Sequence, residues 1–222
     1  VMGHVMANGD TVERILRAAT ILFAERGFAE TSLRTITGMA DVNLAAVNYH
    51  FGTKKSLIQA VFSQFLAPFC RELERRLNEM EASLTTDQLP QVEHLLRILI
   101  DSLTESVRSI NEKPQRFMRL LGLAYTQTQQ HLRTYLANSY GATYNRYIGW
   151  LKKTQPDLDP IVFYWRLNFI LGASIFTLGS FESIQAILQD EHGVDTEMGQ
   201  ALSYLVDGLS GLLSSPNHSH AR

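Results

Sequence analysis

Apolar residues recur every three or four positions in one block of this sequence after another, and no other feature constrains the fold as strongly. In the first block they occupy Val12, Ile15, Leu16, Ala19, Leu22 and Phe23. This spacing places them on one face of a helix. No segment shows the sustained alternation of apolar and polar residues, bounded by turn signals, that strands would need. We therefore predict an all-α protein of about nine helices.

The composition limits the environment and the partners of the chain. Of the 222 residues, 45% are hydrophobic, which is enough for a sizeable core. The single cysteine, Cys70, excludes a disulfide framework within one chain and fits a reducing cytoplasm. A net charge of −2 argues against a protein that coats nucleic acid nonspecifically. The longest apolar run, residues 161–181, carries Arg166 and Asn168, so we expect a buried helix there and no membrane span.

Residues 10–56 are expected to hold a first domain of short helices. The expected caps and breaks are Asp10 with Glu13 as a capping box, Gly27 as the end of the first helix, Thr31 or Ser32 as the second N-cap, and Asn43 as the third. Residues 57–214 form a second helical domain, in which Pro68 should kink or divide a long helix. Later helical blocks are expected at residues 91–109, 114–127, 128–154, 160–190 and 195–214. Residues 1–9 and 215–222 are expected to be disordered tails.

Two short helices joined by a tight turn, with a longer amphipathic helix on each side, are the parts of a helix-turn-helix module. The third helix, at about residues 43–51, would be its recognition helix. Ala45 and Ala46 keep the outward side slim enough for a major groove, and Asn48 and Tyr49 supply donors. Lysines at positions 54 and 55 begin the next helix, where the helix dipole disfavours cations unless phosphates lie nearby. The alternative is a short packed helix without a binding role.

A family pattern appears in residues 21–62. Its motif residues are Phe28, Thr31, Val42, His50, Phe51, Lys54 and Leu57. These residues resemble the DNA-binding domain of TetR-type repressors, over roughly residues 11–66. The family usually has a tyrosine where this chain has Asn48, with Tyr49 next to it.

The resemblance implies a set of DNA contacts in this sequence. Its members are Arg34, Asn43, Leu44, Ala45, Ala46, Asn48, Tyr49, His50 and Lys54. Tyr49, His50 and Lys54 would bind phosphates, and the others would face or support base contacts. Arginine can bridge guanine, and asparagine can pair with adenine. A solvated surface charge at Arg34 and a packing role for Tyr49 are the alternatives.

The second domain contains no nucleotide loop, nucleophile elbow or metal-ligand spacing, so we expect no enzyme, no cofactor and no metal site. Two nearly all-apolar helices close to the C-terminus each need two partners, and the second partner can be another copy of the chain. The expected dimer contacts are Gly172, Ile175, Phe176, Gly179, Leu202, Leu205, Leu209 and Leu212. The alternative is that both helices are buried within one monomer.

The blocks FMRLLGLAYTQTQQHLRTYLANSYG and FYWRLNFILGA resemble the fatty-acid-responsive branch of the TetR family, the PsrA-type regulators. The resemblance implies a long-chain acyl effector. The expected ligand-binding residues are Phe117, Arg119, Leu120, Tyr125, His131, Phe163, Arg166 and Phe169. The aromatic residues could instead be core, and Arg119 or Arg166 could pair with Glu182.

These features predict a cytoplasmic, homodimeric repressor that binds palindromic double-stranded DNA and is released by a small hydrophobic effector. A regulator of drug efflux that responds to a cationic or aromatic ligand is the nearest alternative. A carrier of hydrophobic molecules that binds no DNA is a more distant one.

Overall fold

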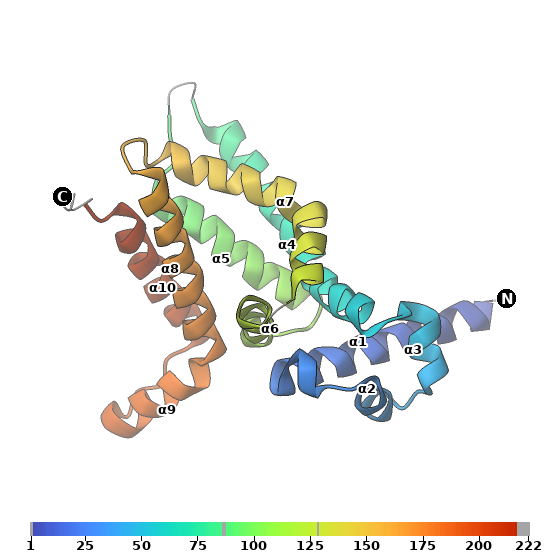
Figure 1. Cartoon of the computed structure of the whole chain (residues 1–222). Coiled ribbons are helices and arrows are strands. Elements are labelled where there is room, and N and C mark those ends of the chain that lie inside the picture. Colours follow the sequence, from blue (N-terminus) through green and yellow to red (C-terminus); the bar gives the residue numbers. More distant parts are fainter. Residues whose placement is uncertain (1, 86–87, 128, 217–222) are drawn as a thin grey trace.

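The computed structural model describes residues 2–85, 88–127 and 129–216, and every regular element within them is a helix (Figure 1). The helices are α1 (Met2–Glu30), α2 (Leu33–Ala40), α3 (Leu44–Phe51), α4 (Lys54–Ser83), α5 (Val92–Ser109), α6 (Pro114–Thr126), α7 (Gln130–Lys153), α8 (Pro160–Gly179), α9 (Phe181–His192) and α10 (Met198–Ser214). The all-α prediction is confirmed. The count is ten because the block expected at residues 160–190 divides at Ser180 into α8 and α9.

The start of α1 differs from the prediction. The helix begins at Met2, so Asp10 lies inside it and the expected capping box is wrong. Residues 2–9, expected to be a disordered tail, belong to this helix, and Asp10 instead forms an ion pair with Arg14 at 3.7 Å. Gly27 leaves the helical conformation with a φ of 84°, as the break signal predicted. Of the C-terminal tail only residues 215 and 216 are described; the rest, like residue 1, lies outside the described residues.

Helix α4 connects the two halves of the molecule. It crosses the domain boundary predicted between residues 56 and 57, and Pro68 lies inside it without dividing it. Near its start, Phe62 packs with Phe28 of α1 at 6.2 Å between ring centroids. One turn later, Phe65 stacks on Phe117 of α6 at 4.9 Å. Aromatic packing on the same helix therefore joins the N-terminal core to the C-terminal core.

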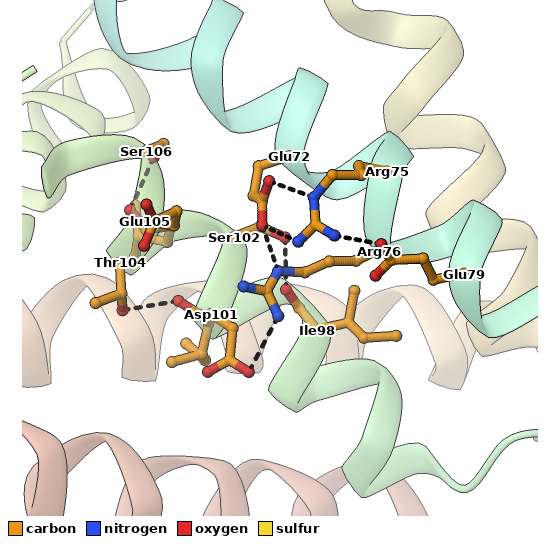
Figure 2. Close-up of polar contacts among 12 residues, drawn as sticks. Glu72, Arg75, Arg76, Glu79, Ile98, Asp101, Ser102, Thr104, Glu105 and Ser106 are labelled. Atoms are coloured by element: carbon orange, nitrogen blue, oxygen red, sulfur yellow. Dashed lines mark hydrogen bonds and ion pairs between the residues drawn. The ribbon is translucent and has the colours of Figure 1, made fainter. Parts of the chain in front are cut away.

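Charged side chains fix the half of α4 that lies away from α3. Figure 2 shows Glu72 between Arg75 and Arg76, with Arg76 also reaching Asp101 of α5 at 3.6 Å. The hydrogen bond from Arg75 keeps the pKa of Glu72 below its usual value. Of these contacts, the ion pair between Arg76 and Asp101 joins α4 to α5.

The contact between α4 and α7 is also polar. Arg146 of α7 binds Glu74, Asn78 and Glu81, and the indole nitrogen of Trp150 donates to Glu81 at 2.7 Å. Hydrogen bonds to Arg146 and Trp150 lower the pKa of Glu81. Because these bonds are directional, they specify how the two helices align.

Helix α8 is less covered than the sequence predicts. Figure 1 shows α8 and α10 side by side at one edge of the body, with α9 extending from the foot of α8. Within the described residues α8 is the one helix long and apolar enough to cross a membrane by length and composition, but only 22% of that window is buried. The buried helix expected at residues 161–181 is therefore not observed in a single chain. Ile161, Trp165, Phe169 and Phe176 are all exposed.

Candidate DNA-binding and effector sites

Two capped helices and a tight turn form the N-terminal site. Ser32 caps α2 by accepting a hydrogen bond from the Thr35 amide, and the Asn43 side chain caps α3 by accepting one from the Ala46 amide at 2.8 Å. Between them Asp41 adopts a left-handed conformation with a φ of 51°. The predicted N-caps at Ser32 and Asn43 are confirmed, and the arrangement is a helix-turn-helix.

The orientation of α3 separates core residues from outward ones. Val47 is 1% exposed and packs into the core, whereas Tyr49 is 79% exposed. Ala45 and Asn48 are exposed beside Tyr49, and Leu44 lies at the start of the same face. The described part of the chain thus leaves a slim face uncovered, with two small or aliphatic residues and two polar ones.

The other residues expected to contact DNA surround that face. Arg34 on α2 and Asn43 before α3 are exposed. His50 is half-buried and meets the Tyr49 ring edge-on at 5.0 Å. Lys54 is half-buried, with Nζ 3.4 Å from the carbonyl oxygen of Ala29. Ala46 packs against the core, so less of its methyl group is available to a base.

Arg14, which was not among the predicted site residues, positions this site. Its guanidinium donates to the carbonyl oxygen of Ala40 at the end of α2, with Nε at 2.9 Å and Nη2 at 2.6 Å. It also contacts Asp41 through the backbone carbonyl and, at 3.6 Å, through the carboxylate. The sequence offered one signal for this role, which is an arginine on the helix that precedes the predicted helix-turn-helix. Arg14 therefore braces α1 against the turn that precedes α3.

The residues expected to bind an effector do not form a single group. Phe117, Leu120 and Phe163 are buried in the core of the second half. Tyr125 and Phe169 are exposed, on α6 and α8. Phe117 and Phe163 are thus core, as the alternative interpretation stated for the aromatic residues, whereas Tyr125 and Phe169 are not.

The two arginines expected to meet an anionic effector are engaged elsewhere. Arg119 donates to the carbonyl oxygen of Gly179 at 2.9 Å and to Glu182 at 3.2 Å, so the alternative pairing with Glu182 is confirmed. Arg166, 8% exposed, donates to the carbonyl oxygens of Leu213 and Ser215, each at 2.7 Å. It satisfies carbonyl groups at the end of α10, which a helix cannot satisfy by itself.

His131, at the start of α7, has a buried Nε2 without a hydrogen-bond partner in the described part of the chain. Burial, and then the positive charge of Lys55, lower its pKa. Within the described residues no group of three or more histidine, cysteine or carboxylate side chains could hold a metal ion.

The residues expected at a dimer interface fall into two groups. Gly172 and Phe176 are exposed on α8, and Phe176 is 75% exposed. Leu205 and Leu209 are buried in the core of the protomer itself, where α10 packs against α5 and α8. Ile175, Gly179, Leu202 and Leu212 are half-buried.

Helix α10 carries a second row of exposed residues, which was not among the predicted dimer contacts. The stripe consists of Tyr204, Gly208 and Gly211, which are exposed at helical spacing. The spacing of the leucines indicates only the buried face of α10, although small residues lie at positions between the leucines. A shallow hollow on α8, lined by Ile161, Tyr164, Trp165 and Asn168, lies near the other end of the same helix pair.

Comparison with protein families gives two matches. The family described as bacterial regulatory proteins, tetR family, matches residues 15–61, which include α2 and α3. The tetracyclin repressor-like C-terminal domain matches residues 97–211, more than half of the chain.

Curated relatives match the N-terminal part. The probable HTH-type transcriptional regulator YttP of Bacillus subtilis is 34% identical over 82 residues, which are 37% of this chain and 40% of that protein. The HTH-type transcriptional repressor Rv3405c of Mycobacterium tuberculosis is 57% identical over 47 residues, 21% of this chain and 25% of that protein. The chain thus matches less than half the length of these relatives.

Solved structures match nearly the whole chain at low identity. A TetR-like transcriptional regulator from Rhodococcus sp. RHA1 superposes with a TM-score of 0.57 and 18% identity, over 91% of this chain and 93% of the other. The regulator FadR from Bacillus subtilis, solved in complex with stearoyl-CoA, superposes with a TM-score of 0.58 and 17% identity, over 91% and 97%. At such identities the likeness establishes the fold.

Proposed function

Since this chain belongs to the tetR family of bacterial regulatory proteins, which are DNA-binding transcriptional regulators and not enzymes, we propose that it is a homodimeric repressor of a palindromic DNA site in the cytoplasm. We further propose that a hydrophobic effector, an acyl compound, releases it from DNA. The sequence resemblance to the fatty-acid-responsive PsrA-type branch supports the choice of effector.

The observation that carries the proposal is the uncovered face of α3. A buried Val47 anchors the helix, and Ala45, Asn48 and Tyr49 point away from the core. Small side chains let a helix enter a major groove about 12 Å wide, and the asparagine amide can form two hydrogen bonds with adenine. Lys54 and the exposed Lys55 at the beginning of α4 supply positive charge for phosphates.

Two features support a dimer: the short recognition helix α3 and the exposed apolar residues of α8. One eight-residue helix contacts too few base pairs for a specific site, whereas two helices related by a twofold axis read two half-sites. Trp165, Phe169, Gly172 and Phe176 form an exposed stripe on α8, and Tyr204 is exposed on α10, which packs against α8. Aromatic and glycine positions of this kind allow close helix packing against a second copy.

The fold offers a path from an effector to the DNA-facing helices. Phe117 and Leu120 of α6 lie in the core that an acyl chain would enter. The other end of α6 touches α1, where Gly27 leaves space for Gln127: a Cβ at Gly27 would lie only 3.0 Å from the Gln127 amide nitrogen. An effector that displaces α6 would shift α1, and with it α3. The ligand thereby favours a state in which the paired recognition helices no longer match the half-sites.

A gel-shift experiment tests the repressor function. DNA fragments selected for binding should shift with an affinity that falls steeply as salt rises, because Lys and Arg contacts release counterions. Tyr49→Ala should lower the affinity by at least about ten-fold, whereas Lys113→Ala, an exposed lysine before α6, should not. A chain that shifts no DNA sequence in preference to any other would contradict the proposal.

A second experiment tests the effector class. Acyl compounds with chains of different lengths are titrated into the protein–DNA complex. Release should depend on chain length, because the transfer free energy grows by about 0.8 kcal/mol per buried methylene group. Indifference to every chain length would remove the acyl effector and leave the repressor function intact.

A further inference from the structure

The boundary between the two halves of the molecule falls inside α4. Phe62 packs on Phe28 of α1, in the N-terminal core. Phe65 stacks on Phe117 of α6, in the core of the second half. The helix itself runs from Lys54 to Ser83 without interruption. The angle between the two halves therefore depends on how α4 is shaped and held where it passes from one core to the other.

The backbone of α4 is weakened at this boundary. Each amide of an α-helix donates to the carbonyl oxygen four residues earlier, but a proline has no amide hydrogen. Pro68 lies inside α4, so the carbonyl of Gln64 receives no bond from the amide four residues later. The proline ring also crowds that carbonyl, and helices bend at such positions. We call residues 64–68 the hinge segment, because α4 can bend there.

Helix α7 lies beside α4 (Figure 1) and is bonded to it on both sides of the hinge segment. On the side before it, the hydroxyl of Tyr135 lies 2.6 Å from the hydroxyl of Ser63, which itself donates to the carbonyl oxygen of Gln59 at 3.0 Å. Because a serine has one hydroxyl proton, Tyr135 is the donor in the first pair. On the side beyond it, Arg146 of α7 binds Glu74.

The two bonds are in register. Ser63 and Tyr135 are 72 positions apart in the sequence, and so are Glu74 and Arg146. The same number of residues therefore separates the two contacts on α4 and on α7. Since every residue of an α-helix adds the same rise, the contacts match as long as both helices stay straight between them. Helix α7 thus acts as a splint across the hinge segment.

The DNA-binding half is attached to α4 at the start of the hinge segment. Gln64 donates from its side-chain amide to the hydroxyl of Thr20 on α1. Thr20 is fully buried, and its own hydroxyl donates to the carbonyl oxygen of Leu16 at 2.7 Å. Because α1 is bonded to α4 at this point, a bend in the hinge segment would move α1 and α3 together with the first turns of α4.

We propose that Tyr135 and Ser63 are positioning residues for DNA binding: their bond keeps the hinge segment from bending and so fixes the distance between the recognition helices of two copies. Lys54, with which α4 begins after α3, lies about 15 Å along the helix from Gln64. A bend of about 10° would displace it by about 3 Å, close to the rise of one base pair, about 3.4 Å. The bond is therefore placed to select the spacing between half-sites. This inference rests on the dimeric repressor proposed above.

The spacing of half-sites tests the inference. Selected half-sites are placed at the preferred spacing and at one base pair more or less, and the affinity for each fragment is measured. Tyr135→Phe and Ser63→Ala should each lower the ratio of the affinity at the preferred spacing to that at the altered spacings by about three- to ten-fold, which is the effect of one hydrogen bond. The base preferences within a half-site should remain those of the wild type, because α3 is unchanged.

A second tyrosine of α7 provides the matched control. Tyr147 donates from its hydroxyl to the carbonyl oxygen of Leu95 on α5 at 3.1 Å, and this bond does not cross the hinge segment. Tyr147→Phe should therefore keep the wild-type ratio of affinities. Equal losses in Tyr135→Phe and Tyr147→Phe, or no loss in Tyr135→Phe and Ser63→Ala, overturn the inference.

Two combined variants test the splint itself. Tyr135→Phe together with Ser63→Ala should lower the ratio no further than either change alone, because both remove the same bond. Pro68→Ala returns an amide donor to the Gln64 carbonyl and should restore the ratio in Tyr135→Phe. Additive losses, or no restoration by Pro68→Ala, contradict the splint. Selected fragments without a palindrome would instead remove the dimeric repressor and, with it, this inference.

Discussion

Arg14 of α1 donates a hydrogen bond from Nε to the carbonyl oxygen of Ala40 at 2.9 Å, across 26 positions of the sequence. Ala40 is the last residue of α2, and its carbonyl has no partner within that helix. The bond fixes the direction in which the chain leaves α2. It thereby sets the left-handed turn at Asp41 and the position of α3. A residue outside the helix-turn-helix thus determines how its recognition helix is presented.

Replacing this arginine tests the brace. Arg14→Ala should lower the free energy of unfolding by about 1–2 kcal/mol, because partly buried carbonyl groups lose a charged donor. It should also weaken operator binding without changing the preferred sequence. Arg17→Ala, at an exposed position on the same helix, serves as the control in urea unfolding. Equal stability of the two variants would show that Arg14 does not brace the turn.

Arg166 should be a structural residue and not an effector contact. Arg166→Met removes the donor to the carbonyls of Leu213 and Ser215 and should cost about 2–4 kcal/mol in urea unfolding. Arg108→Met, which removes an exposed pair with Glu105, should cost less than about 1 kcal/mol. If Arg166→Met instead kept full stability and abolished the response to acyl compounds, Arg166 would be an effector ligand.

The exposed face of α8 should be the dimer contact. Phe176→Asp places a charge at its most exposed aromatic position and should shift the mass measured by light scattering from two chains toward one. Operator affinity should fall with it. Leu89→Asp, an exposed apolar residue before α5, is the matched control and should remain dimeric. A Phe176→Asp protein that still has the mass of two chains would place the interface elsewhere.

The ion pairs of α4 should make stability depend on pH. Arg146 and Trp150 lower the pKa of Glu81 in the folded state, so its contribution exists above the unfolded pKa and is lost as the pH falls through about 4 and below. Glu81→Gln should lower the unfolding free energy at pH 7 by no more than about 1 kcal/mol, since the pair is one-third exposed and screened. The difference from the wild type should shrink as the pH falls below the ordinary pKa of a glutamate, about 4.3. A difference that is independent of pH would assign the loss to packing.

Signals within one turn of a helix predicted this fold well. The N-caps at Ser32 and Asn43 and the break at Gly27 are local features, and each lies where the sequence indicates. The start of α1 was wrong because a capping box at Asp10 can also lie inside a longer helix. The division at Ser180 was missed because apolar residues run on both sides of it.

Contacts between distant parts of the chain were harder to predict. Periodicity shows that Leu205 and Leu209 belong to an apolar face, but not whether their own core or a second copy covers it. The sequence likewise shows that Arg166 lies within an apolar run. It does not show that the partners of Arg166 are backbone carbonyls 47 and 49 positions away.

The outward face of α3 is the basis of the proposed DNA binding, and selection of bound DNA fragments tests its role directly. We predict palindromic sites whose half-sites are separated by about one helical turn of DNA. Asn48→Ala should then relax the preference at one position in each half-site by about 1–3 kcal/mol and leave the other positions unchanged. Selected fragments without any palindrome, or the same base preferences in the wild type and in Asn48→Ala, would contradict the claim that paired copies of α3 read the DNA.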